Sequence, residues 1–240
     1  MTKTQGRLIV DGAIAGAVNM GRDEALLELQ SVPTLRFYRW QNPTLSLGYF
    51  QNAADIDIAA ARERGCDVVR RSTGGKAILH EHELTYALCA PEIGALAGGP
   101  AAAMQVIHQA FAKELSAQSA KEVFIRQQST LQSDIVGSAW CFEDSSPLDI
   151  CLDGKKLLGS AARRKNNWIL FHGSLVLEVP NETPEIAALG FEPNISACVD
   201  ALAAALGIDF TAGAWTPDEI SLGDSIATEK YATEAFLHKR

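Results

Sequence analysis

The apolar positions of this chain alternate with polar ones over many short segments, a pattern typical of half-buried β-strands. Such segments cover residues 7–11, 34–40, 44–48, 67–71, 76–80, 83–89, 148–153, 157–161 and 168–178. Asn42-Pro43 is a turn signal, and it predicts that the second and third segments form a hairpin-like pair. Turns at Gly154 and at residues 163–167 separate the last three segments, which predict an antiparallel meander.

Apolar residues at helical spacing predict a few separate helices between and after the strands. Asn19 is expected to cap the first helix, and Gly65 to follow the end of the second, which covers residues 55–64. Further helices are expected at residues 104–115 and 195–206, and at the capping box Thr216–Glu219. Residues 116–140 give no assignment.

The order of these elements indicates the fold class. Strands outnumber helices, and the regular alternation of strand and helix that marks a parallel sheet is missing. We therefore predict an α+β fold with a largely antiparallel or mixed sheet flanked by helices. Because no Pro-, Ser- or Gly-rich tract marks a boundary, residues 1–240 are expected to form a single domain.

Composition and charge argue against several classes of protein. A net charge of -8 argues against a general nucleic-acid-binding protein. No apolar stretch approaches the roughly 20 residues of a membrane span. The N-terminus lacks the apolar core of a signal peptide, so we expect a cytoplasmic protein. The 5 cysteines include no C-x-x-C pair, so no metal site is expected.

The first segment that could carry chemistry is Arg70-Arg71-Ser72-Thr73-Gly74-Gly75-Lys76, between two predicted strands. Adjacent glycines let backbone N–H groups approach a ligand, while the arginines and the lysine supply charge for a phosphate or a carboxylate. The spacings of a P-loop and of a dinucleotide-binding loop are both absent. An ordinary Gly-Gly hairpin turn is the alternative interpretation.

The second candidate is Cys141 together with Lys156, both near predicted turns. A thiol attacks thioesters as the thiolate, and an amine held among Lys155, Arg163 and Arg164 is expected to have a lowered pKa and to act as its base. The remaining cysteines lie in apolar strand or helix patterns and are expected to be buried. A small buried structural residue is the alternative for Cys141 as well.

His80 and His172 lie in strand-like segments close to glycine-containing stretches. Neither belongs to an H-x-x-x-H or H-E-x-x-H pair, so a metal is not indicated. A hydrogen-bonded strand histidine is the expected role of each, and a place beside a ligand pocket is the alternative.

Four blocks in this order resemble the biotin/lipoate protein ligase superfamily. They are Arg39-Trp40 with residues 43–48 and Gln51, residues 67–86, Gly154-Lys155-Lys156-Leu157-Leu158-Gly159-Ser160-Ala161, and His172-Gly173-Ser174-Leu175. The resemblance covers roughly residues 5–180 and implies a class II synthetase-like catalytic domain.

Within the superfamily, Cys141-Phe142 and residues 80–86 resemble the LipM-type octanoyltransferases. The resemblance implies that Cys141 takes octanoate from octanoyl acyl carrier protein as a thioester, with help from Lys156. A lysine of a lipoyl domain or of the glycine-cleavage H protein would then remove it as an amide. Arg71, Ser72, Thr73, Gly74, Gly75, His80, Gly159, Ser160, Ala161 and His172 are the substrate-binding residues that it implies.

No cofactor is expected for such a transferase, because a thioester is already activated. The superfamily leaves other readings open. In an ATP-dependent lipoate-protein ligase, with ATP and Mg²⁺, Lys156 would bind the acyl adenylate and Cys141 would be incidental. A lipoyl or octanoyl amidotransferase and a non-enzymic binding subunit are further alternatives. The basic stretches around Arg71 and Lys156 are expected to meet acidic carrier and lipoyl domains.

Overall fold

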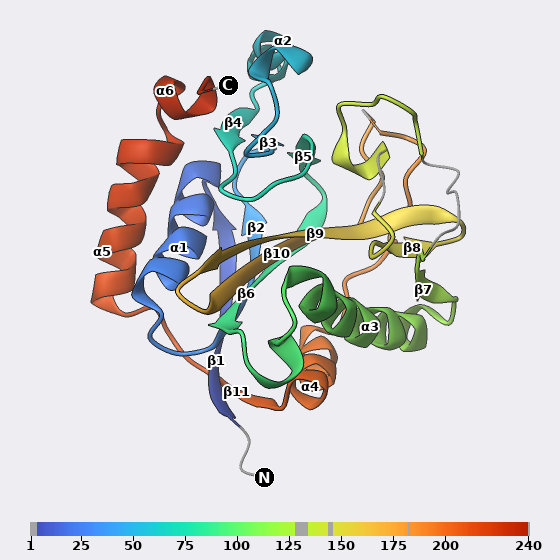
Figure 1. Cartoon of the computed structure of the whole chain (residues 1–240). Helices are drawn as coiled ribbons and strands as arrows, with labels where there is room; N and C mark the ends of the chain where they lie inside the picture. The colour runs from blue at the N-terminus through green and yellow to red at the C-terminus, as the bar shows by residue number, and fades with distance from the viewer. Residues whose placement is uncertain (1–3, 128–133, 144–145, 182, 240) are drawn as a thin grey trace.

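The computed structural model describes residues 4–127, 134–143, 146–181 and 183–239. A large sheet of 8 strands, in the order β11-β1-β2-β6-β10-β9-β8-β7, forms its centre (Figure 1). In chain order these strands are β1 (Thr4–Ile14), β2 (Thr34–Trp40), β6 (Glu83–Pro91), β7 (Val123–Ile125), β8 (Ile150–Leu152), β9 (Lys155–Lys165), β10 (Trp168–Val176) and β11 (Ile208–Ala212). β1 runs parallel to β2 and β11, whereas the other neighbours pair antiparallel, so the sheet is mixed.

Helices cover both faces of this sheet. α1 (Gly16–Leu29) and α5 (Pro217–Ile226) lie on one side, and α3 (Pro100–Ser119) and α4 (Ile195–Leu206) lie on the other (Figure 1). The expected α+β architecture is therefore confirmed. Over the described residues, no helix combines the length and the apolar character that crossing a membrane requires.

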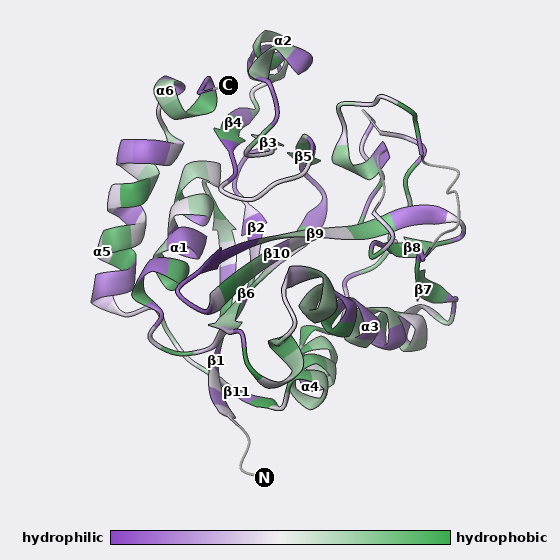
Figure 2. Ribbon diagram, viewed as in Figure 1, coloured by the Kyte–Doolittle hydropathy of each residue, from purple (hydrophilic) through white to green (hydrophobic). Residues whose placement is uncertain are grey.

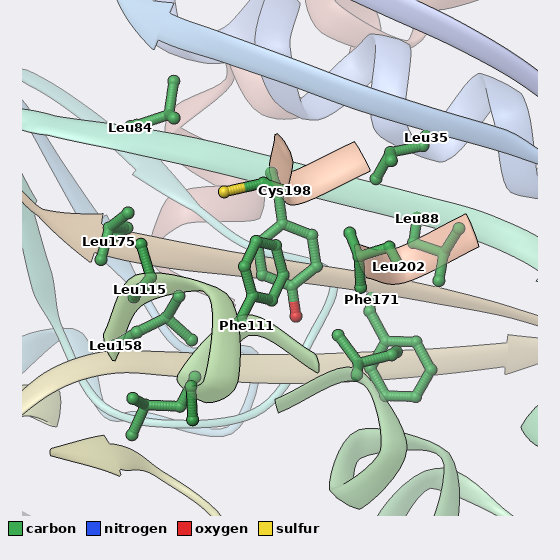
Figure 3. Close-up of a cluster of buried hydrophobic side chains, with 14 of the residues drawn as sticks. Leu35, Leu84, Leu88, Phe111, Leu115, Leu158, Phe171, Leu175, Cys198 and Leu202 are labelled. Carbon is green, nitrogen blue, oxygen red and sulfur yellow. The ribbon is translucent and has the colours of Figure 1, made fainter. Parts of the chain in front are cut away.

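The two helical layers enclose two separate cores, because successive side chains of a strand point to opposite faces. Leu88 and Phe171 lie in the core beneath α3 and α4, where Phe111 and Leu202 pack against them (Figure 3). Leu170, one residue along β10, packs on the other face in a cluster that includes Leu27 of α1. β6 and β10 are consequently buried almost throughout, and side chains that project from them are held on a rigid support.

A second sheet of 3 strands, in the order β4-β3-β5, lies beside the large one. It consists of β3 (Thr44–Leu47), β4 (Asp67–Arg70) and β5 (Ile78–His80), with the short helix α2 (Ile58–Glu63) against it and α6 (Glu234–Leu237) nearby (Figure 1). β3 pairs parallel with β4 and antiparallel with β5. The connection from β4 to β5 carries the Gly74-Gly75 segment.

The hairpin-like pair expected around Asn42-Pro43 is wrong. β2 belongs to the large sheet and β3 to the small one. The physical reason is that β1 and β6 occupy both edges of β2, so β2 has no free edge for β3. The turn signal correctly indicated a change of direction, but it could not indicate which strand comes next in the sheet.

The expected cap of the first helix is also wrong. α1 begins at Gly16, and Asn19 is buried inside it. Its side-chain amide donates to the carbonyl oxygens of Ile14 and Arg39, at 3.0 Å each, and its oxygen accepts from Arg36 at 2.7 Å. The residue therefore links helix to sheet, a role that local spacing does not reveal.

Other expectations are confirmed. β8, β9 and β10 form the antiparallel meander, and helices occur at the expected places over residues 58–63, 100–119 and 195–206. Thr216 and Glu219 form the capping box at the start of α5. In the unassigned stretch 116–140 the structure places the end of α3 and β7, while residues 128–133 lie outside the described part of the chain.

Candidate active site

A cavity of about 430 Å³ lies between β9 and β10 of the large sheet and the loop that joins β4 to β5. Most of the residues singled out from the sequence line it: Arg71, Gly74, Gly75, His80, Cys141, Lys156, Gly159, Ser160, Ala161 and His172. Ser72 and Thr73 do not line it. The folded chain thus brings both candidate segments to one place, although about 70 residues separate them.

The glycine loop is held in shape by Arg71. Its guanidinium donates to the Ser46 carbonyl oxygen at 2.8 Å and to the Ser46 hydroxyl at 2.6 Å. It also donates to the Lys76 carbonyl oxygen at 2.7 Å and to that of Gly74 at 3.3 Å. Arg71 was expected to supply charge to a ligand, and here it also braces the loop that borders the cavity.

The backbone of Gly75 requires glycine at two positions, its own and that of Gly48. Its φ of +94° lies in the left-handed region, which side chains other than glycine rarely adopt. Its carbonyl oxygen also lies against Gly48, where an added Cβ would come within 1.7 Å of that oxygen. This packing fixes the path of the loop past Cys141, whose Sγ lies 3.8 Å from the position that a Cβ on Gly75 would take.

Cys141 begins a short 3₁₀ turn, Cys141–Glu143, and is half-buried. Its backbone N–H donates to the Ala77 carbonyl oxygen at 2.8 Å, and the Ala77 N–H donates to the Ala139 carbonyl oxygen at 3.0 Å. These bonds tie the thiol to the edge of the small sheet, next to the glycine loop.

The remaining cysteines are buried, as expected. Burial raises the pKa of Cys151 to about 12 and that of Cys198 to about 11, and it also raises the pKa of Cys89. These thiols therefore stay protonated and unreactive. Cys141 differs from them in lining the cavity.

Lys156 reaches Cys141 from β9. Its buried Nζ donates to the Cys141 carbonyl oxygen at 2.8 Å and lies 3.8 Å from Sγ. The same Nζ forms an ion pair of 2.8 Å with the carboxylate of Asp149. The thiol, the amine and a carboxylate therefore meet at the wall of the cavity.

The expected lowering of the Lys156 pKa is wrong. Burial on its own lowers this pKa, but the negative charges of Cys141 and then of Asp149 outweigh burial and raise it. The basic neighbours that the sequence suggested point elsewhere. Lys155 pairs with Glu185 at 3.1 Å, and Arg164 at the other end of β9 pairs with Glu92 at 2.7 Å. Lys156 is accordingly an ammonium in the resting site.

Asp149 was missed by the sequence analysis. It immediately precedes β8 and is 2 % exposed. Its position within Leu148-Asp149-Ile150 made it look like the solvent-facing residue of an alternating strand. The sequence signal for it was a carboxylate in the segment that leads to Gly154-Lys155-Lys156, just before the strand that pairs with β9.

His80 belongs to a buried network behind the glycine loop. Burial outweighs Glu83 and lowers the pKa of His80, so the ring is neutral. Its Nδ1 donates to Glu83 at 2.7 Å, and its Nε2 accepts from the Ser46 hydroxyl at 2.6 Å. The ring also stacks on Trp40 with 4.0 Å between centroids. This is the hydrogen-bonded strand histidine that the sequence predicted, and through Ser46 it supports Arg71.

His172 anchors the other end of the loop. Its Nε2 lies 2.6 Å from the Thr73 hydroxyl, and its Nδ1 lies 3.4 Å from a carboxylate oxygen of Asp23. Thr73 therefore acts from behind the cavity wall, and Ser72 bonds to the hydroxyl of Tyr231 instead of facing the cavity. Ser72 and Thr73 were expected to contact the substrate directly. In the structure they hold the glycine loop from outside the cavity.

The Gly159-Ser160-Ala161 segment forms the wall opposite the glycine loop. The Ser160 hydroxyl lies 2.7 Å from both the Tyr86 hydroxyl and Nε2 of His108. Burial lowers the pKa of His108, whose Nδ1 donates to the Leu148 carbonyl oxygen at 2.5 Å. His108 therefore joins the wall to the residue next to Asp149, another contact that sequence spacing did not indicate.

The basic turn at the far end of β9 is neutralised within the chain. Figure 2 shows hydrophilic residues at both ends of this strand. At the turn end, Arg163 lies 3.6 Å from Glu24, Arg164 pairs with Glu92, and Lys165 pairs with Glu28. The expectation that this stretch offers charge to an acidic partner gains no support from such pairing.

Comparisons with known proteins place the chain in a family. A family model described as the lipoyl protein ligase A/B catalytic domain matches residues 15–185. Octanoyltransferase LipM of Brevibacillus brevis is 30% identical over 98% of this chain and 99% of its own length. Octanoyltransferase LipM of Geobacillus kaustophilus is 38% identical over 76% of this chain and 69% of its own length.

Solved structures agree on the fold. Lipoate-protein ligase A bound with ATP superposes with a TM-score of 0.76 at 22% identity, covering 98% of each chain. A bi-partite lipoate protein ligase of Thermoplasma acidophilum gives 0.75 at 21% identity, covering 98% of this chain and 97% of that one. With the site assembled from the same segments that carry the sequence match, this chain belongs to the family of lipoyl protein ligase A/B catalytic domains.

Proposed function

We propose that this protein is an octanoyltransferase of lipoate biosynthesis, which moves octanoate through a thioester on Cys141. The observation that carries the proposal is the placement of Cys141 Sγ, 3.8 Å from the Lys156 amine, at the wall of a cavity of about 430 Å³. The LipM relatives support the octanoyl group as the cargo. The proposed donor is octanoyl acyl carrier protein, and the proposed acceptor is a lipoyl domain or the glycine-cleavage H protein. The proposed location of the reaction is the cytoplasm.

In the first half of the reaction, Cys141 attacks the donor thioester as the thiolate. The Sγ–carbonyl carbon bond forms, and the bond from that carbon to the carrier sulfur breaks. The Lys156 ammonium gives its proton to the departing carrier thiolate, which leaves as a thiol. An ammonium at 3.8 Å also stabilises the thiolate before the attack.

In the second half, the neutral amine of the acceptor lysine attacks the octanoyl carbonyl. Neutral Lys156 takes the proton that this nitrogen must lose, and the carbon–Sγ bond breaks. The products are an octanoyl amide, the Cys141 thiolate and the Lys156 ammonium, so the starting charge state returns. General acid–base assistance of this kind contributes roughly 10²- to 10⁴-fold.

The cavity suits a short acyl chain. From Gly159 to Ala162 its wall follows β9 for about 10 Å, at roughly 3.3 Å per residue. Met20 of α1 adds an apolar side chain to the lining. This length and character match eight carbons in extended form, with the carbonyl group at Cys141.

The ATP-dependent ligase reaction is the alternative, because lipoate-protein ligases share the fold. That reaction starts from a free carboxylate, which must first become an adenylate. Cys141 would then be dispensable, and Lys156 would bind the adenylate. We propose instead that no ATP is needed, since the donor is already a thioester.

Intact mass after mixing with octanoyl acyl carrier protein, without ATP, distinguishes these reactions. The wild type is expected to gain the mass of one octanoyl group, and Cys141→Ala to gain none. Cys198→Ala, a buried cysteine of α4, is the matched control and should acylate like the wild type. Absence of the adduct, together with transfer that depends on ATP in both cysteine variants, would select the ligase.

A further inference from the structure

We propose that Asp149 is a positioning residue, which holds the Lys156 ammonium beside Cys141 and keeps the amine there after the thiol is acylated. The inference rests on the proposed function. A fixed anion is needed beside the amine throughout the reaction. Cys141 loses its charge when it is acylated, and Lys156 changes its charge when it gives up a proton, so neither residue can supply it.

The carboxylate is itself firmly held. The Ser146 N–H donates to it at 2.6 Å, and the Asp149 N–H donates to the Ser146 carbonyl oxygen at 3.0 Å. The Asp149 carbonyl oxygen accepts from the Arg126 N–H at 2.9 Å, at the end of β7. Both the backbone and the side chain of Asp149 are therefore fixed, whereas a lysine reaches its position through four flexible bonds.

Asp149 stays an anion beside Lys156 when Cys141 is acylated. Within the part of the chain that the structure describes, the amine interacts with Cys141 of the 3₁₀ turn, Asp149, His108 of α3 and Cys151 of β8. His108 is neutral because burial lowers its pKa, and Cys151 is a thiol because burial raises its pKa to about 12. Once Cys141 carries an acyl group, Asp149 is the anion among these groups.

This arrangement couples the state of Cys141 to the proton affinity of Lys156. A charge on Cys141 raises the Lys156 pKa more than the charge on Asp149 does, and together they outweigh the effect of burial. Acylation removes the charge of Cys141, so the pKa of Lys156 falls. The amine can then release its proton to the departing carrier thiolate. Asp149 keeps the neutral amine in place by accepting its N–H, and it limits the fall of the pKa.

The test uses protein in which iodoacetamide has alkylated Cys141, since the thioether can no longer form a thiolate and no acyl donor is needed. The pH titration of the Lys156 side chain is followed by NMR in protein labelled with ¹³C-lysine, and Lys156→Arg assigns the signal. Asp149→Asn is expected to lower the titration midpoint by about one pH unit or more, because an opposite charge at this distance typically shifts a pKa by 1–3 units. Asp153→Asn removes an exposed carboxylate in the β8–β9 turn and should leave the midpoint unchanged.

A kinetic measurement completes the test. Asp149→Asn is expected to reduce kcat for octanoyl transfer about 100-fold with little change in the KM for the donor. Asp149→Ser, also uncharged and smaller, serves if the asparagine variant does not fold. An unaltered Lys156 midpoint in the folded variant overturns the proposal. If the wild type transfers no octanoate, the proposed function fails, while the titration still decides the role of Asp149.

Discussion

Gly159 lies so close to Lys156 that a Cβ on the glycine would stand 2.7 Å from Cε and 2.9 Å from Nζ of the lysine. The backbone of Gly159 thus leaves the space that the lysine fills on its way to Cys141. A glycine in the middle of a strand costs stability, and here it marks the close approach of a functional side chain.

Gly159→Ala should therefore displace the Lys156 amine while the sheet stays intact. We expect octanoyl transfer to fall about 100-fold, since a displacement of about 1 Å at a catalytic group costs a factor of this size. Gly12→Ala is the matched control, because nothing lies within 4 Å of its added Cβ. Equal rates for both variants, measured at equal thermal stability, would show that the contact has no functional role.

Removing the Lys156 charge should leave Asp149 buried without its partner. Lys156→Met is expected to lower the free energy of unfolding by about 3–5 kcal/mol, the usual cost of breaking a buried ion pair. Adding Asp149→Asn should recover part of this loss, because no charge then remains. Urea denaturation of the two single variants and the double variant measures the coupling. Lys121→Met breaks an exposed pair with Asp153 and should cost less than about 1 kcal/mol.

Acid should destabilise the fold through its buried histidines. Burial lowers the pKa of His80 and of His108 below the usual 6.5 of a histidine, so below pH 6.5 the unfolded chain binds protons that the folded chain does not bind. Stability is therefore full above pH 6.5 and is lost as the pH falls, by at most about 1.4 kcal/mol per pH unit for each histidine.

His108→Gln should flatten this slope, which urea denaturation between pH 7.5 and 5 measures. His82→Gln is the matched control, because the side chain of His82 is 52% exposed. A slope that both variants share with the wild type would contradict the assignment of His108.

Thr73→Val tests the link between the glycine loop and β10. The substitution keeps the shape of the side chain but removes the hydroxyl that lies 2.6 Å from His172. We expect a stability loss of about 1–3 kcal/mol, because a buried ring nitrogen loses its partner. Acylation of Cys141 should slow as the loop loosens. Thr211→Val, on the outer strand β11, should change neither quantity. Wild-type acylation by Thr73→Val would show that the loop keeps its shape without this bond.

The sequence by itself determined the elements that depend on neighbouring residues. The meander of β8, β9 and β10 follows from alternation and from the turn at Gly154, and α5 begins at Thr216 because its capping box is a local motif. The glycine loop, Cys141 and Lys156 were recognisable as chemistry-bearing residues because their types and spacing are unusual. Local patterns also indicated that the other cysteines are buried.

Only the tertiary structure decided which strands pair and which charges meet. β1 pairs in parallel with β11, a strand from the C-terminal part of the chain, and periodicity contains no information about such pairing. The Lys156 pKa was predicted in the wrong direction because Lys155 and Arg164 pair with other carboxylates, whereas Asp149, just before β8, lies 2.8 Å from the Lys156 amine. Electrostatic energy depends on distance in space, and a residue pattern along the chain records only distance in sequence.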